Sequence, residues 1–300
     1  MKTLFEGTGV ALVTPFREDL SLDLDALRHL VDDVIEGGVD YLVALGTTAE
    51  SATLSRAEKQ QVMQTVLEAN AGRKPLVVGI GGNHTLAVGE ELQQTPLQGF
   101  DAVLSVSPYY NRPTQEGIYR HFRYLAERSP LPLILYNVPA RTGSNMLAGT
   151  TLRLARECPN LIGIKEACGD MAQIRDLAAQ LPEDFLLLSG DDFTAVDTVL
   201  AGGAGVISVL GQGLPRVFSG MMRQAAAGNR EAAQQQSQAL TPLMQGIFRE
   251  GNPAGIKALL HLKGICTPAV RLPLVAASAG LTEHLARELK TLEAGQPVGR

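Results

Sequence analysis

The chain has 300 residues, of which 45% are hydrophobic and 19% are charged, as is usual for a folded globular protein. Its net charge of -5 at pH 7 provides no basic face, which argues against a nucleic-acid partner. The widely spaced Cys158, Cys168 and Cys266, and the lack of a signal peptide or a long apolar run, predict a cytoplasmic protein with reduced thiols, no metal and no membrane association.

Apolar runs alternate with amphipathic stretches eight times along the first 227 residues. The predicted strands are 9–15, 40–45, 75–80, 102–107, 133–136, 161–165, 185–189 and 205–209. The predicted helices are 23–36, 55–69, one from 85, 114–127, 147–157, 171–180, 194–201 and 214–226. Ser55 and Glu58 have the spacing of a capping box, which supports the start of the second helix.

Strands that alternate with helices predict a parallel sheet, and eight such units predict a closed (β/α)8 barrel over residues 1–227. A doubly wound open sheet is the alternative, but it favours a phosphate-binding turn after the first strand, and Pro15–Arg17 offers none. From residue 228 the pattern changes to helices only, predicted at 230–247, 254–262 and 282–292. We expect a C-terminal helical domain, 228–300, that ends in a frayed tail at 296–300.

The run Leu161–Glu166 carries a lysine at the end of a strand that should be buried on both faces. A buried ammonium is costly, and a desolvated lysine has a lowered pKa and becomes a nucleophile toward carbonyls. Alternation would place Leu161, Gly163 and Lys165 on one face, with Gly163 leaving space beneath the lysine. The alternative is a lysine whose side chain simply reaches solvent.

The active site of such a barrel lies at the carboxyl ends of its strands, so the residues found there are candidates for chemistry. Thr47 and Thr48 could hold a carboxylate, and Tyr136 could transfer protons. The planar guanidinium of Arg141 also suits a carboxylate. Each has a plainer alternative as a turn, rim or loop residue.

Two further pairs of residues follow barrel strands. Tyr109 and Tyr110 lie between prolines, a pattern more typical of packing or interface residues than of catalysis. Asp191 and Asp192 could bind a metal, but we expect one of them to cap the next helix instead.

A lysine, a tyrosine and paired hydroxyls at one barrel mouth indicate a reaction class. A lysine amine and a 2-oxo acid form a Schiff base, whose enamine attacks an aldehyde, and this chemistry needs no metal or other cofactor. A barrel that binds a keto acid without turnover is the non-enzymatic alternative.

The segments Gly46–Thr48, Tyr136–Pro139 and Gly163–Glu166 resemble the pyruvate-dependent class I aldolase superfamily, which includes N-acetylneuraminate lyase. Longer segments are similar to the dihydrodipicolinate synthase family: 107–117, 135–143, 162–167, 187–192 and 205–209. The resemblance covers almost the whole chain and implies condensation of pyruvate with L-aspartate 4-semialdehyde, on the route to lysine and diaminopimelate. An N-acetylneuraminate or 2-oxo-3-deoxy-sugar-acid aldolase is the alternative, but it would not need Arg141.

The resemblance also implies roles for individual residues. Lys165 would form the pyruvate imine, and Tyr136, Thr47 and Tyr110 would relay protons. Tyr110 would come from a neighbouring subunit of a homotetramer built as a dimer of dimers. The substrate-binding residues would be Thr48 for the pyruvate carboxylate, Arg141 for the semialdehyde carboxylate, and Gly190 and Ile207 through their backbones.

The sequence departs from the family pattern at two places. Ala49 stands where a glycine is usual, which would cost about 1 kcal/mol if the loop needed a positive φ there. Relatives that lysine inhibits use matches to Ser51, Ala52, Asn83 and Tyr109, together with histidines and a glutamate. Arg56, Lys59 and Ala87 stand at those last positions, and we expect weak or absent inhibition by lysine because the ligand is itself cationic.

Overall fold

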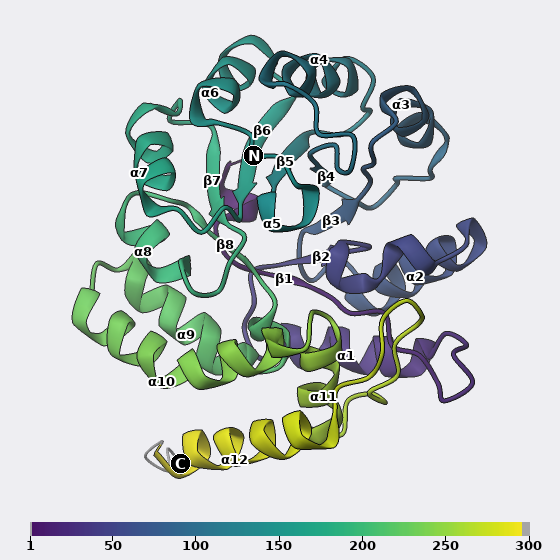
Figure 1. Ribbon diagram of the computed structural model, residues 1–300, viewed down its shortest axis with the longest axis vertical. Coiled ribbons are helices and arrows are strands. Elements are labelled where there is room, and N and C mark those ends of the chain that lie inside the picture. The colour runs from purple at the N-terminus through teal and green to yellow at the C-terminus, as the bar shows by residue number, and fades with distance from the viewer. Residues whose placement is uncertain (1, 296–300) are drawn as a thin grey trace.

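Residues 2–295 are described by a computed structural model, in which eight parallel strands form a closed barrel inside a ring of helices (Figure 1). The strands pair in sequence order, and β1 closes the barrel against β8. This arrangement confirms the predicted (β/α)8 barrel and excludes the open sheet. The predicted tail at 296–300 lies outside the described residues.

The elements follow the predicted order. The strands are β1 Gly7–Ala11, β2 Tyr41–Ala44, β3 Leu76–Gly79, β4 Ala102–Val106, β5 Leu133–Asn137, β6 Leu161–Glu166, β7 Leu186–Ser189 and β8 Gly205–Ser208. The barrel helices are α1 Leu24–Glu36, α2 Arg56–Asn70, α3 Thr85–Gln94, α4 Gln115–Ala126, α5 Pro139–Thr142, α6 Ala148–Glu157, α7 Met171–Gln180, α8 Ala195–Leu200 and α9 Pro215–Ala226. Short 3-10 helices are η1 Lys2–Phe5, η2 Thr47–Ala49, η3 Ser51–Thr53 and η4 Leu210–Gln212. The capping box of Ser55 and Glu58 is present.

The first strand differs most from its prediction, since it starts earlier and ends at Ala11. The apolar pattern continues to Val13, but the N–H of Val13 donates to the side chain of Gln212 at 2.9 Å. A side chain thus takes the place of a neighbouring strand, and the ladder ends. Short η helices and α5 lie in segments that have no periodic pattern of apolar residues.

The apolar residues form two cores on the two sides of the barrel wall. The inner core includes Val43, Leu104, Ile134, Leu188 and Ile207, and the outer core packs the strands against the helices. At the amino ends of the strands Phe5 closes the barrel, with its ring edge-on to Tyr41 at 5.5 Å. Side chains therefore fill the barrel at the amino ends of its strands, and only the carboxyl ends of the strands are left to form a site.

The predicted alternation along β6 is wrong at its start. Leu133 pairs with Leu161 and Ile134 pairs with Gly163, so that Ile162 is an extra residue in the ladder. Such a bulge reverses the facing of the preceding side chain. Leu161 consequently lies in the outer core with Ile164, while Ile162 packs against the inner core.

Beyond the barrel the chain forms α10 Arg230–Arg249, α11 Ala254–Leu262 and α12 Ala279–Gly295. In Figure 1, α10 (green) runs beside α9, and α12 (yellow) forms the outer edge of the molecule. α10 and α12 are each longer than predicted. Among the helices of residues 2–295, none has the length and apolar character needed to cross a bilayer.

Candidate active site

Lys165 and Tyr136 lie side by side at the carboxyl ends of β6 and β5. The two residues are in register, so their side chains point to the same side of the sheet, into the barrel. Lys165 is only 4% exposed, and its Nζ lies 4.3 Å from the centroid of the Tyr136 ring. Burial lowers the pKa of Lys165 to about 8; the charge of Arg141 acts in the same direction and that of Asp192 opposes it. At pH 7 about a tenth of this lysine is therefore the neutral, nucleophilic amine, far more than for an exposed lysine.

Tyr136 is paired with Thr47 across the mouth of the barrel. Burial raises the pKa of the Tyr136 phenol, while the charge of Arg141 and a hydrogen bond from Thr47 oppose the rise. Thr47 comes from η2, directly after β2, and its side chain is exposed to the cavity. A protonated phenol in contact with a hydroxyl can pass protons to and from a reacting atom.

Gly190, rather than Gly163, makes room for Lys165. A Cβ on Gly190 would lie 2.9 Å from Cγ and 3.0 Å from Cε of the lysine. The space at Gly163 is taken instead by Leu186, whose Cβ and carbonyl oxygen would be 2.7 Å and 2.9 Å from an added Cβ. The predicted role of Gly163 is thus wrong, and the expected pocket residue Gly190 abuts the lysine itself. Ile207 is fully buried in the inner core.

Neither aspartate after β7 caps the following helix, contrary to the prediction. Asp191 accepts from the N–H of Phe193 at 3.0 Å, and the first position before α8 has no side-chain cap. Asp192 instead reaches β8, where it accepts from the Ser208 hydroxyl at 2.5 Å and from the Leu210 N–H at 2.8 Å. Burial raises the pKa of Asp192 to about 6, and those hydrogen bonds oppose the rise. Asp192 thereby ties the ends of β7 and β8 together close to Lys165. Within residues 2–295, no three acidic, cysteine or histidine side chains form a group suited to a metal.

A cavity of about 430 Å³ opens above this centre, and of the two expected carboxylate-binding residues Arg141 lines it and Thr48 does not. Arg141 and Thr47 line it together with Asn252, which lies between α10 and α11. A smaller hollow of about 70 Å³ extends from Thr47 down to Tyr136. The two hollows share Thr47 and lead to Tyr136, beside which Lys165 lies.

Asn252 links the two expected carboxylate-binding residues, and no motif or periodicity had indicated it. Its Nδ2 donates to the Thr48 hydroxyl at 2.9 Å, and its carbonyl accepts from Arg141 at 3.3 Å. The Thr48 hydroxyl is left free to donate its own proton to a substrate carboxylate. A residue some 200 positions away in the chain thus orients Thr48.

The loop that carries Thr47 and Thr48 is anchored by a buried ion pair. Nζ of Lys257, on α11, lies 2.6 Å from Oε1 of Glu50, and both side chains are fully buried. Oε2 of Glu50 accepts from the N–H of Arg271 at 2.9 Å. The left-handed residues here are Leu45, at φ 55°, and Glu50, at φ 54°, whereas Ala49 lies inside η2. Alanine therefore fits without the cost expected for a positive φ.

Tyr110 does not join the site within a single chain. Its side chain is 89% exposed, and its backbone has φ 71°. Tyr109 does line the large cavity, together with Ser51 and Ala52. Asn83 donates to the Tyr109 carbonyl at 3.1 Å, so the four expected regulatory residues lie in one region.

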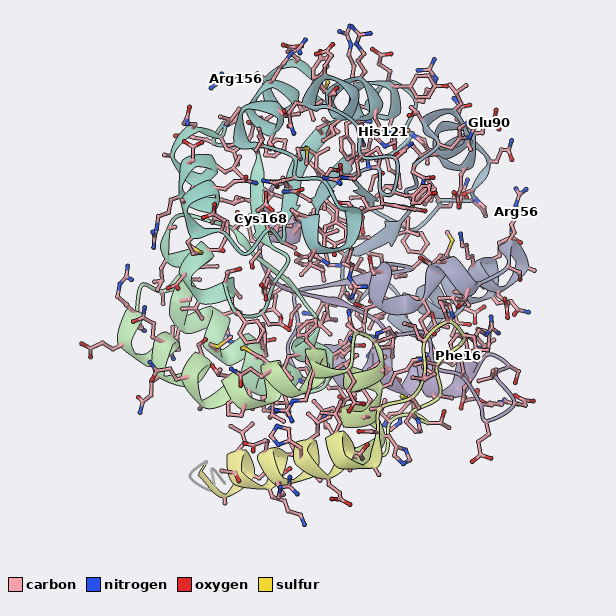
Figure 2. All side chains as sticks on the ribbon, in the orientation of Figure 1. Phe16, Arg56, Glu90, His121, Arg156 and Cys168 are labelled. Carbon is pink, nitrogen blue, oxygen red and sulfur yellow. The ribbon has the colours of Figure 1, made fainter. Side chains whose placement is uncertain are left out.

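The substituted regulatory positions line a neighbouring cavity of about 240 Å³ between α2 and α3. Arg56, Lys59 and Ala87 lie there with Glu90 and Glu91, and Lys59 is 3.6 Å from Glu91. Figure 2 shows Arg56 and Glu90 at the outer edge of these two helices. Acidic side chains thus accompany the two cations, and position 87 itself carries no carboxylate.

Replacing Gly190 with alanine is expected to displace the side chain of Lys165, because the new Cβ would overlap Cγ and Cε. The rate at which Lys165 forms a borohydride-reducible imine with a 2-oxo acid should fall about tenfold or more, since that rate depends on the placement of the amine. Mass spectrometry of the reduced adduct measures it. Gly220→Ala in α9 is the matched control, because beyond the adjacent residues and backbone of the helix itself no atom lies within 4 Å of the Cβ position there. An unchanged rate in Gly190→Ala would contradict the steric role.

Comparison with known proteins identifies the family. The model of the dihydrodipicolinate synthetase family matches residues 4–292. The 4-hydroxy-tetrahydrodipicolinate synthase of Flavobacterium psychrophilum is 54% identical over 281 residues, which cover 94% of this chain and 96% of that protein. The enzyme of the same name from Porphyromonas gingivalis is 48% identical over 288 residues, or 96% of this chain and 97% of that protein.

Solved structures agree with the sequence matches. Dihydrodipicolinate synthase from Thermotoga maritima has a TM-score of 0.94 at 40% identity, with 97% of this chain and 99% of that chain covered. A chloride-inhibited dihydrodipicolinate synthase from Acinetobacter baumannii, complexed with pyruvate, has a TM-score of 0.93 at 39% identity, with 96% and 99% covered. The agreement extends over both the barrel and the C-terminal helices, and the chain belongs to the dihydrodipicolinate synthetase family.

Proposed function

We propose that this protein condenses pyruvate with L-aspartate 4-semialdehyde to give 4-hydroxy-tetrahydrodipicolinate, as a class I aldolase-type lyase of lysine and diaminopimelate biosynthesis. The relatives named for this product support the reaction. The observation that carries the mechanism is the buried amine of Lys165, with its lowered pKa, beside the phenol of Tyr136. No cofactor is needed, because the lysine imine itself serves as the electron sink.

In the proposed mechanism the neutral Lys165 amine attacks C2 of pyruvate, and the carbinolamine loses water to form an imine. Tyr136 and Thr47 supply and remove the protons. Loss of a proton from C3 then gives an enamine, whose C3 attacks the aldehyde carbon of the second substrate. The resulting alkoxide takes a proton from the relay. The amino group of the former semialdehyde then attacks C2 of the imine, which closes the six-membered ring, and the Lys165 amine leaves as the new ring imine forms.

The two substrates would be held through their carboxylates. The Thr48 hydroxyl, which accepts from Asn252, would hold the carboxylate of pyruvate. Arg141, which lines the cavity of about 430 Å³, would hold the carboxylate of the semialdehyde. Gly190 and Ile207 would line the pocket with their backbones. An N-acetylneuraminate or 2-oxo-3-deoxy-sugar-acid aldolase has no use for Arg141, and the names of the relatives also favour the synthase.

The assembly and the location of the protein are part of this proposal. A homotetramer, built as a dimer of dimers, would bring Tyr110 of one subunit into the relay of its neighbour. The 89% exposure of that side chain in a single chain supports this role. We also propose a cytoplasmic protein, with residues 1–227 as the catalytic barrel and 228–300 as the C-terminal helical domain.

Treatment with pyruvate and borohydride should leave a reduced adduct on Lys165, located by peptide mass mapping. The initial rate of adduct formation should rise as the pH rises through about 8, because the amine loses its proton there. Consumption of aspartate 4-semialdehyde, compared with cleavage of N-acetylneuraminate, identifies the second substrate. An unmodified Lys165 would refute the mechanism.

Arg141→Ala should cripple turnover with the semialdehyde while leaving formation of the pyruvate imine measurable. The loss of a charged hydrogen-bonding partner for a carboxylate corresponds to about 10- to 100-fold in kcat/KM. Arg156→Ala, at an exposed position on α6, is the matched control. Equal losses in both steps would contradict a role specific to the second substrate.

Inhibition by lysine is expected to be weak or absent. Position 87 lacks a carboxylate, and Arg56 and Lys59 add positive charge beside the ammonium that a lysine ligand would bring. Steady-state assays over a range of lysine concentrations test this, and Ala87→Glu should raise the sensitivity. Half-inhibition of the unaltered enzyme at submillimolar lysine would refute the prediction.

A further inference from the structure

Asn137 and Glu166 form a buried pair directly beyond the two residues proposed to do the chemistry. They are partners in the β5–β6 ladder, one position after Tyr136 and Lys165, and both are 0% exposed. Nδ2 of Asn137 lies 2.9 Å from Oε1 and 3.0 Å from Oε2 of Glu166. Because side chains alternate along a strand, this pair lies on the outer side of the barrel wall, away from the cavity.

Asn137 also fastens the loop that follows β5. Its Oδ1 accepts from the N–H of Met146 at 3.0 Å, and its Nδ2 is 2.7 Å from Oδ1 of Asn145. The chain leaves Asn137, passes through α5 and returns to the same side chain. Arg141 lies in the middle of this closed loop.

Glu166 is surrounded by donors only. Besides Asn137, it accepts from the Cys168 N–H at 2.8 Å and from Nε2 of Gln173, on α7, at 3.0 Å. Burial raises the pKa of Glu166, and the hydrogen bonds from Asn137, Gln173 and Cys168 oppose the rise. A carboxylate that only accepts fixes the orientation of the Asn137 amide, because the oxygen of that amide cannot face it.

We propose that Asn137 and Glu166 are positioning residues that set where Arg141 meets the aldehyde substrate. Glu166 orients the Asn137 amide, the amide holds both ends of the loop, and the loop places Arg141. This inference rests on the proposed function, since it assigns the pair to the second substrate of that reaction.

The residues proposed to bind and activate pyruvate are held by other contacts. The Tyr136 carbonyl accepts from the Ser107 N–H at 2.9 Å, and the residue is in register with Val106 of β4. Lys165 is paired with Leu188 of β7, and Thr48 accepts from the side chain of Asn252, which contacts Arg141 only through its backbone carbonyl. A weakened Asn137–Glu166 pair should therefore disturb the aldehyde substrate more than pyruvate.

The test is steady-state kinetics of Asn137→Asp, which keeps the shape of the side chain but sets two carboxylates against each other. The KM for the semialdehyde should rise about tenfold or more, as for a lost buried hydrogen bond to a charged group, while the pyruvate KM changes less than about threefold. The borohydride-trapped adduct on Lys165 should form as in the unaltered enzyme. Asn229→Asp, the same change at an exposed position before α10, is the matched control.

A compensating variant tests the pair itself. Asn137→Asp combined with Glu166→Gln exchanges the amide and the acid between the two strands, so that a donor again faces an acceptor. The semialdehyde KM should return to within about threefold of the original value. If Asn137→Asp does not fold, Gln173→Ala removes one donor to Glu166 without touching the strands, and it should raise the same KM by a smaller factor.

Three results would overturn the proposal. They are an unchanged semialdehyde KM in the variants, an equal rise in both KM values, and a lower melting temperature as the sole effect. Failure of the proposed function has a different signature, since the unaltered enzyme would then form no pyruvate adduct on Lys165.

Discussion

The register between β5 and β6 is the constraint on which the site depends. In a parallel ladder, neighbouring residues in register point to the same side, so a single alignment places Tyr136 with Lys165 inside and Asn137 with Glu166 outside. A shift by one residue would turn the lysine into the helix layer and bury a carboxylate in the barrel interior. The bulge at Ile162 precedes this segment and brings the strand into the correct alignment.

Two buried lysine side chains in this protein have different roles. Lys257 is fully buried with Glu50 2.6 Å away, and the carboxylate opposes the fall in the pKa of Lys257 that burial causes. Lys165 is nearly as buried, but the structure gives it no ion pair among the described residues, and its pKa falls to about 8. Lys257 and Lys165 thus differ in whether a carboxylate forms an ion pair with them, and hardly in how deeply they are buried.

The sequence was sufficient for the barrel, because eight apolar runs alternate with amphipathic segments and each run marks a strand end. It also pointed to Lys165, since a lysine at the end of an apolar run is unusual in itself.

The glycine that makes room for Lys165 was predicted wrongly: Gly163 is near the lysine in sequence, but Gly190 is the glycine in contact with it. Asp192 was expected to act locally, as a cap, and instead reaches across to Ser208. The contact between Asn252 and Thr48 could not be predicted, because the periodicity of a sequence carries no information about contacts between residues about 200 positions apart.

The contact between Glu50 and Lys257 has a consequence for the architecture of the chain. Lys257 also packs over the ring of Phe16 at 4.1 Å, where the segment after β1 meets the C-terminal segment (Figure 2). A barrel made without residues 228–295 would leave Glu50 with neither the Lys257 ammonium nor the Arg271 N–H, and the loop that carries Thr47 and Thr48 would lose this anchor. The barrel and the helices after it therefore form one cooperative unit, and residue 228 marks a change of architecture rather than a place where the protein can be divided.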